Sequence, residues 1–309
     1  MNDFRIPVGD WVTTLVDLVT RYLGGLFDVI STVFTALFDT LDVALSAPPF
    51  WVIIVVLVAL SVLARGWIFG AGAAVGLLLI VGLDQWDNAM DTLALTLVAA
   101  LIAIVISVPI GIWAARSDRV STTIRPVLDF LQTMPAFVYL IPAIILFGVG
   151  AVPGIVATIT FALAPGVRFT ELGIRGVDKE VIEAGQAFGA SPGRILRQIQ
   201  LPLARPTIMA GVNQVIMLSL SMVVIASMVG AKGLGSDIVQ ALSRIDVGLG
   251  SEAGLSVVIL AILLDRLTAS LGSERSARKR LLPTFSTAKN AAEETPVPAE
   301  AKTATPSLA

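Results

Sequence analysis

EAGQAFGASPGRILRQIQLP, residues 183–202, is a polar and glycine-rich stretch in a chain that is otherwise apolar enough to cross a bilayer several times. The stretch contains two prolines and two arginines, and apolar segments lie on both sides of it. A simple connection between two membrane spans needs no such composition. We therefore expect residues 183–202 to form a defined structure with a function of its own.

The residues at and just before this stretch predict two short helices joined by a glycine turn. Asp178 is a suitable N-cap for the first helix, and Gly189 can end it in the left-handed conformation at little cost. Ser191 and Pro192 then restart a helix, with serine as N-cap and proline at its first position. We expect Pro202 to end this second helix. One side of the first helix carries Val181, Ala184, Gly185 and Phe188, and one face of the second carries Ile195, Leu196 and Ile199.

The composition is that of a polytopic membrane protein. Of 309 residues, 56% are hydrophobic and 14% are charged, and the mean hydropathy is +0.88. The chain has no cysteine and no histidine. It therefore cannot contain a disulfide, a Cys/His zinc site or a histidine-based catalytic triad, and we expect neither a metal site nor a catalytic residue.

Apolar segments predict an all-α fold with about seven transmembrane helices. At 1.5 Å per residue most of these segments can cross a hydrocarbon core of about 30 Å, although the first two are marginal. Their ranges are 50–65, 67–83, 92–115, 127–149, 153–170, 206–229 and 251–271.

Residues 10–45 predict an amphipathic helix ahead of these spans. Apolar residues recur every three or four positions, whereas Asp17, Asp28 and Asp39 are spaced eleven residues apart on the other face. A helix lying on the membrane surface fits this pattern, and a soluble helix packed on another chain is the alternative. Pro48 and Pro49 end it.

The charge distribution predicts the orientation. With residues 1–49 outside and seven spans, only Arg5, Arg21, Lys232 and Arg244 lie outside, and the other 17 of the 21 basic residues lie inside. Basic residues favour the cytoplasmic side, so we expect a multi-pass protein of the bacterial cytoplasmic (inner) membrane with its N-terminus outside and its C-terminus inside.

The tail, residues 272–309, begins with basic residues and continues as an Ala/Thr/Pro/Glu-rich stretch. We expect its last 27 residues to be disordered. The basic residues either bind anionic lipid or act only as a topology signal; they are Arg275, Arg278, Lys279 and Arg280.

Residues 183–202 resemble the EAA loop of ABC importer permeases, in which Glu-Ala-Ala is followed by a glycine and a terminal Leu-Pro. Five further segments resemble the permease subunit of the proline/glycine betaine importer family: WDNAMDTLALT (86–96), LQTMPAFVYLIPAIILFGVG (131–150), LPLARPTIMAGVNQ (201–214), LSMVVIASMVG (220–230) and ILAILLDRLT (259–268). The resemblance covers about residues 84–271. Gly185 departs from it, because alanine is usual there, and we expect this glycine to loosen the helix.

The resemblance implies a type I importer fold over residues 84–271, with residues 50–83 as two accessory helices. It implies a homodimer, two copies of a separate ATPase docked on the two loops of residues 178–202, and an extracellular protein that delivers an osmolyte such as glycine betaine, proline betaine or proline. The permease would bind no cofactor, because ATP and magnesium would bind the ATPase. The coupling role falls on Glu183, Ala184 and Gly189, and the loop also contains Gly185, Phe188, Ser191, Pro192, Leu201 and Pro202.

Candidate pathway residues lie in two spans. Asn213 and Gln214 are polar groups within the sixth span, where they either line a pathway or bond to another helix. Pro135 interrupts the fourth span, and the rings of Phe137 and Tyr139 either contact a passing quaternary ammonium or pack against neighbouring helices.

Other features have plainer interpretations. The segment 230–235 lacks the ending of a phosphate loop and is expected to form an external turn or gate. Asp265 and Arg266 are expected to form an ion pair or a snorkelling pair, and Arg168 and Glu171 are expected to be structural, in salt bridges with the loop.

Three other functions stay open: a permease for another amine or amino acid, a secondary transporter that needs no ATPase, and an intramembrane enzyme. The expected partners are a second copy of the chain, the ATPase, the binding protein and lipids, and no nucleic acid.

Overall fold

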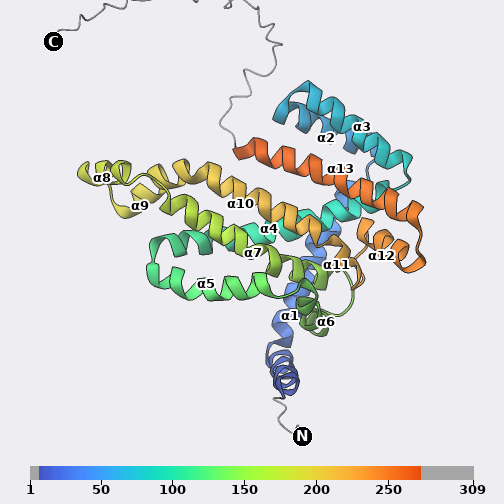
Figure 1. The fold of residues 1–309 in the computed structure, drawn as a ribbon, viewed down its shortest axis with the longest axis horizontal. Coiled ribbons are helices and arrows are strands. Elements are labelled where there is room, and N and C mark those ends of the chain that lie inside the picture. Colours follow the sequence, from blue (N-terminus) through green and yellow to red (C-terminus); the bar gives the residue numbers. More distant parts are fainter. Residues whose placement is uncertain (1–6, 273–309) are drawn as a thin grey trace, which may run out of the picture. The chain divides into compact units, whose positions relative to one another are not determined.

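The structure is a computed structural model that describes residues 7–272 (Figure 1). All regular structure in this range is helical, which confirms the all-α prediction. The predicted disorder and lipid binding of the tail fall outside the described residues. The elements are α1 (Val8–Ser46), α2 (Phe50–Arg65), α3 (Trp67–Gly82), α4 (Trp86–Arg116), α5 (Asp118–Thr133), α6 (Ala136–Phe147), α7 (Ala151–Arg175), α8 (Lys179–Ala187), α9 (Pro192–Ile195), a π-helical turn (Leu196–Gln200), α10 (Leu201–Ser221), α11 (Val223–Ser227), α12 (Leu234–Arg244) and α13 (Val247–Gly272).

The centre of the bundle consists of α4, α7 and α10, which pack closely because glycines face their neighbours. A Cβ on Gly166 of α7 would lie 2.2 Å from the Ser107 Oγ of α4. A Cβ on Gly211 of α10 would lie 2.5 Å from the Cβ of Phe169 on α7. Small residues at such contacts let helix backbones approach, and in a bilayer this close packing supplies much of the attraction between helices.

The helix lengths agree with about seven spans. Helices α4, α7 and α13 and the α9–α11 segment are long and apolar enough to cross a membrane, and α5 and α6 are a pair bent by 97° that would make either one broken span or a re-entrant loop. Helices α2 and α3 are apolar but have only 16 residues each, so they reach about 24 Å. With these two, with the α5–α6 pair taken as one span and with α1 left out, the described residues would hold seven spans.

Helix α1 crosses the direction of α4, α7 and α10 (Figure 1). Length and hydropathy alone would also let it span a membrane. Its contacts, however, lie at one end of the bundle: the rings of Phe27 and Phe147 are 5.5 Å apart at the end of α6, and Asp39 and Asp42 share a pocket with Asp91 in the second turn of α4. The placement of α1 on the membrane surface stays a prediction.

Candidate coupling loop and translocation path

Helix α8 begins and ends as the sequence predicts. The Asp178 carboxylate accepts a hydrogen bond of 2.9 Å from the backbone N–H of Glu180. Gly189 follows the helix with φ of +76°, and its N–H donates to the carbonyl of Gln186 at 2.8 Å. The predicted left-handed glycine turn is confirmed, and it sends the chain back beside α8.

The inner side of α8 packs on the second helix of the loop. Ile182 belongs to an apolar cluster with Ile199 and Leu196. A Cβ on Gly185 would lie 2.7 Å from the Ile199 Cδ1. The glycine at this position therefore lets the two short helices approach closely, and its expected loosening of α8 stays a prediction. Gly185 also lies on this packed side, and not with Phe188 as the helical pattern suggested.

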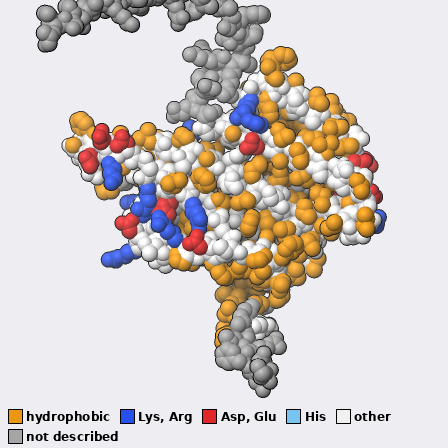
Figure 2. All heavy atoms as spheres, in the orientation of Figure 1, with side chains coloured by type: hydrophobic (Ala, Val, Ile, Leu, Met, Phe, Trp, Pro, Cys, Tyr) orange, Lys and Arg blue, Asp and Glu red, His pale blue; other side chains and the backbone are white. Residues whose placement is uncertain are grey.

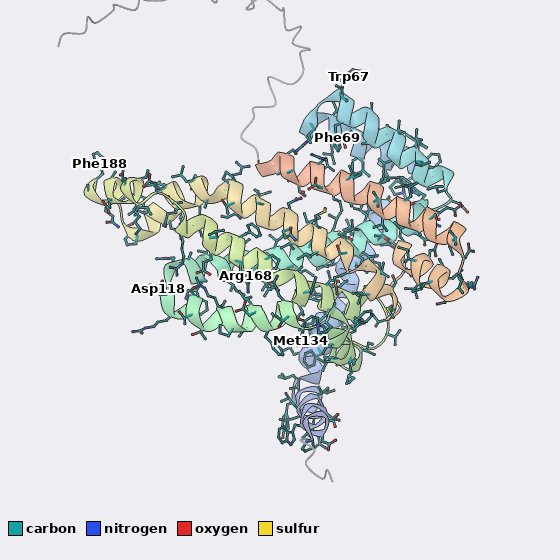
Figure 3. The ribbon with its side chains drawn as sticks, in the orientation of Figure 1. Trp67, Phe69, Asp118, Met134, Arg168 and Phe188 are labelled. Carbon is teal, nitrogen blue, oxygen red and sulfur yellow. The ribbon has the colours of Figure 1, made fainter. Side chains whose placement is uncertain are left out.

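The outer side of α8 has no partner within residues 7–272. Glu183 and Ala184 are exposed, Val181 is 41% exposed, and Phe188 is 91% exposed at the tip of the loop (Figure 3). Burial of this ring on a partner would contribute about 1.5–3 kcal/mol.

The second helix does not end at Pro202, contrary to the prediction. Ser191 is at the N-cap position without a capping hydrogen bond from its side chain, and Pro192 is the first residue of α9. The chain then passes through the π-helical turn into α10 without a break. Leu201 donates its N–H back to Leu196, a five-residue spacing, just before Pro202, which has no N–H to give. Residues 192–227 are consequently one continuous segment, from the loop deep into the membrane span.

An ion-pair network ties α5 to the end of α7. The buried Glu171 carboxylate accepts a hydrogen bond of 2.6 Å from Ser121 and lies 3.2 Å from Arg125 and 3.0 Å from Arg175. Arg168 pairs with Asp129 of α5. Arg168 and Glu171 are thus in salt bridges as expected, but with α5 and not with the loop. Figure 2 shows basic and acidic side chains gathered at this end of the bundle.

Three of the candidate pathway residues lie at the break between α5 and α6 or in the first turn of α6. Pro135 is the N-cap of α6. Tyr139 is buried, and its hydroxyl donates a hydrogen bond to the carbonyl of Leu131 on α5. Phe137 is 51% exposed. Of the two rings, only that of Phe137 is free to meet a passing molecule in this conformation.

The two polar residues of α10, Asn213 and Gln214, also differ in their surroundings. Asn213 donates a hydrogen bond of 2.9 Å to Asp265 of α13 and accepts one from Thr268. It therefore makes the inter-helix contact that was one of its two interpretations. Gln214 is exposed and remains the candidate for pathway lining. Arg266 lies 3.6 Å from Asp265, which confirms that ion pair.

Residues 230–235 form the turn that leads into α12, and they dock on the first turns of α4. The Leu234 N–H donates to the Thr92 hydroxyl at 2.8 Å. A Cβ on Gly233, which has φ of +111°, would lie 2.5 Å from that hydroxyl oxygen. Asn88 and Gln85 both donate to the Asp237 carboxylate, at 2.9 and 3.0 Å. These hydrogen bonds between α12 and α4, here called the α12 lock, were not predicted from the sequence. The only sequence signal for them is the row of Gln85, Asn88 and Thr92 along one helix face.

Comparisons with known proteins agree with this architecture. The chain matches the family described as binding-protein-dependent transport system inner membrane component over residues 107–273. It is 48% identical over 273 residues to the glycine betaine/carnitine transport permease protein GbuB of Listeria monocytogenes, with 87% of this chain and 96% of that protein covered. It is 46% identical over 273 residues to the glycine betaine/proline betaine transport system permease protein ProW of Escherichia coli, with 88% of this chain and 77% of that protein covered.

The fold also resembles a solved structure. An inward-facing crystal form of the MetNI methionine ABC transporter superposes with a TM-score of 0.55 at 22% identity, covering 59% of this chain and 91% of that one. At this identity the likeness concerns the fold alone. Together with the family match over more than half of the chain, the loop and the bundle lead to one conclusion: the chain belongs to the family of binding-protein-dependent transport system inner membrane components, the membrane permeases of ABC importers.

Proposed function

We propose that this chain imports compatible solutes of the glycine betaine, proline betaine and proline type, as a homodimer driven by two copies of a separate ATPase. The names of the relatives, which are glycine betaine permeases, support this substrate class. The chain would serve in osmoprotection. Cargo selection would fall mainly to the extracytoplasmic binding protein, because a conduit that held the cation tightly would release it slowly.

The observation that carries the proposal is the rigid loop with an exposed apolar tip. Val181, Ala184 and Phe188 face solvent on α8, while Ile182 and Gly185 fix α8 to the following helix. An ATPase that moves this tip would move α10 as well, because residues 192–227 are continuous. ATP and magnesium would bind the ATPase, and this chain would contribute packing and no chemistry.

The proposed orientation places α8 in the cytoplasm. Basic residues lie at the α8 end of the bundle, including Arg116, Arg125 and Arg175, whereas Asp87, Asp91 and Asp237 lie near the opposite end. The positive-inside rule then puts α1 and α12 on the outer side, where the binding protein would dock.

Reconstitution in nanodiscs tests the function. The permease with its ATPase and binding protein is expected to hydrolyse ATP faster when glycine betaine is added, and in vesicles to accumulate the solute only with ATP inside. Accumulation by the permease alone on an ion gradient would mean a secondary transporter. Stimulation of ATP hydrolysis by another amine or amino acid, and not by betaines or proline, would mean that the chain transports a different class of substrate.

A further inference from the structure

An apolar groove with a volume of about 240 Å³ lies between α3 and α13. Phe69, Gly72 and Gly76 of α3 form one wall, and Ile259 and Ile262 of α13 are part of the other. Ile262 is 53% exposed, so the groove opens to the outside of the chain. The groove is separate from the coupling loop, the α5–α6 break and the α12 lock.

The groove exists because small residues leave room along part of α3. At Gly76 the two helices nearly touch, since a Cβ there would lie 2.9 Å from the Ile259 Cγ2. One turn earlier, a Cβ on Gly72 would meet no atom within 4 Å. The gap thus narrows at Gly76 and widens toward Phe69 and the start of α3.

The surroundings decide what can fill this gap. Both walls belong to apolar helices, and the side chains lining the groove offer no hydrogen-bond partner to water. In a bilayer the medium around such helices is lipid hydrocarbon. From Phe69 to Gly76 the groove runs about 10 Å along α3, which suits a segment of one acyl chain.

Residues beside the wide end suit a phospholipid head group. Arg65 ends α2, four residues before Phe69, and Trp67 begins α3, two residues before it (Figure 3). Trp67 is 72% exposed, as tryptophans at membrane interfaces commonly are. Arg65 is exposed and takes part in none of the ion pairs of residues 7–272. Within that range no acidic side chain pairs with its guanidinium, which could bind a phosphate with two parallel hydrogen bonds.

We propose that the α3–α13 groove binds one membrane phospholipid, with an acyl chain along Gly72 and the phosphate at Arg65. The lipid would complete the contact between the short α2–α3 hairpin and α13. This proposal depends only on the chain being a membrane protein and not on what it transports.

Native mass spectrometry of the full-length protein, extracted in a mild detergent, tests the site. The wild type is expected to retain one phospholipid per chain. Gly72→Leu places its Cβ where no atom lies within 4 Å and directs a side chain into the groove, so it is expected to lower the retained phospholipid about tenfold or more, because each buried methylene adds to lipid affinity. Gly254→Leu on α13 also has free space within 4 Å and lies outside the groove, so it is expected to retain the lipid as the wild type does.

Two further variants keep the test decisive if Gly72→Leu does not fold. Ile262→Trp blocks the groove from the α13 side and should likewise lose the lipid. Arg65→Gln leaves the groove open and should weaken retention by removing the phosphate contact. Absence of bound phospholipid in the wild type, or equal retention in Gly72→Leu and Gly254→Leu, overturns the proposal. A change in oligomeric state without lipid loss in the blocked variants also overturns it, because a second copy of the chain would then occupy the groove.

Discussion

The hydroxyl of Tyr139 donates a hydrogen bond to the carbonyl of Leu131 across the break between α5 and α6. In an unbroken helix that carbonyl would accept the N–H of residue 135, which is a proline and has none. Tyr139 therefore replaces the missing donor from one turn further along. The bend of 97° at Met134 and Pro135 is held by a side chain and not by the backbone alone.

Tyr139→Phe is expected to destabilise the bend. The Leu131 carbonyl would lose its donor, and a buried unsatisfied carbonyl costs about 1–3 kcal/mol. We expect a lower melting temperature in detergent and slower transport. Tyr22→Phe is the matched control, because Tyr22 is 76% exposed on α1 and no hydrogen bond of its hydroxyl is seen within residues 7–272. Equal melting temperatures for the two variants would contradict this account.

Gly189→Val is expected to uncouple hydrolysis from transport. Its φ of +76° strains any β-branched residue, at a cost of order 1–3 kcal/mol, so the turn would open and misdirect α9. Gly193→Val is the control, because Gly193 lies in α9 with helical backbone and free space around it. ATPase rates with and without binding protein, beside uptake in vesicles, are the measurements. Normal coupled uptake by a well-folded Gly189→Val protein would refute the coupling role.

Phe188→Ala should weaken the complex with the ATPase and leave the permease itself unchanged. The ring is 91% exposed, so its loss removes no internal packing. Truncating a buried aromatic anchor at an interface commonly costs 2 kcal/mol or more, which predicts roughly a thirtyfold higher Kd. Val149→Ala, at an exposed position at the other end of the bundle, is the control. An unchanged Kd in pull-down titrations would mean that the ATPase does not contact Phe188.

Glu171→Gln is expected to destabilise the α5–α7 contact strongly. The carboxylate is buried and accepts hydrogen bonds from Ser121 and Arg125 beside Arg175, and loss of a hydrogen-bonded charge of this kind costs about 1.5–3 kcal/mol. Asp129→Asn removes half of an exposed pair and should cost at most about 1 kcal/mol. Thermal unfolding in detergent measures both. Similar melting temperatures would show that the network contributes little.

Cysteines at Asp17, Asp28 or Asp39 should react with an impermeant maleimide in intact cells. The chain has no native cysteine, and these positions are exposed on α1, which we place outside. A cysteine at Gln186, exposed on α8, should react only after permeabilisation. The opposite pattern would reverse the orientation.

The helical class, the approximate number of spans and the loop with its capped helix and glycine turn could all be predicted from the residues. These features depend on local properties: apolar length, capping residues and the conformational freedom of Gly189. The resemblance of several segments to a permease family added a predicted function, that of an importer permease, to these structural predictions.

Which side chains are exposed and which are held by other helices depends on the packing of the folded chain. Asn213 and Gln214 are neighbours in the sequence, yet one is held by α13 and the other is exposed. Tyr139 and Gly185 likewise take their roles from Leu131 and Ile199, contacts that no periodicity reveals. Pro202 predicts a helix end because it has no N–H to donate. The helix nevertheless continues, because a π-helical turn directly before Pro202 changes the hydrogen-bond spacing from four residues to five.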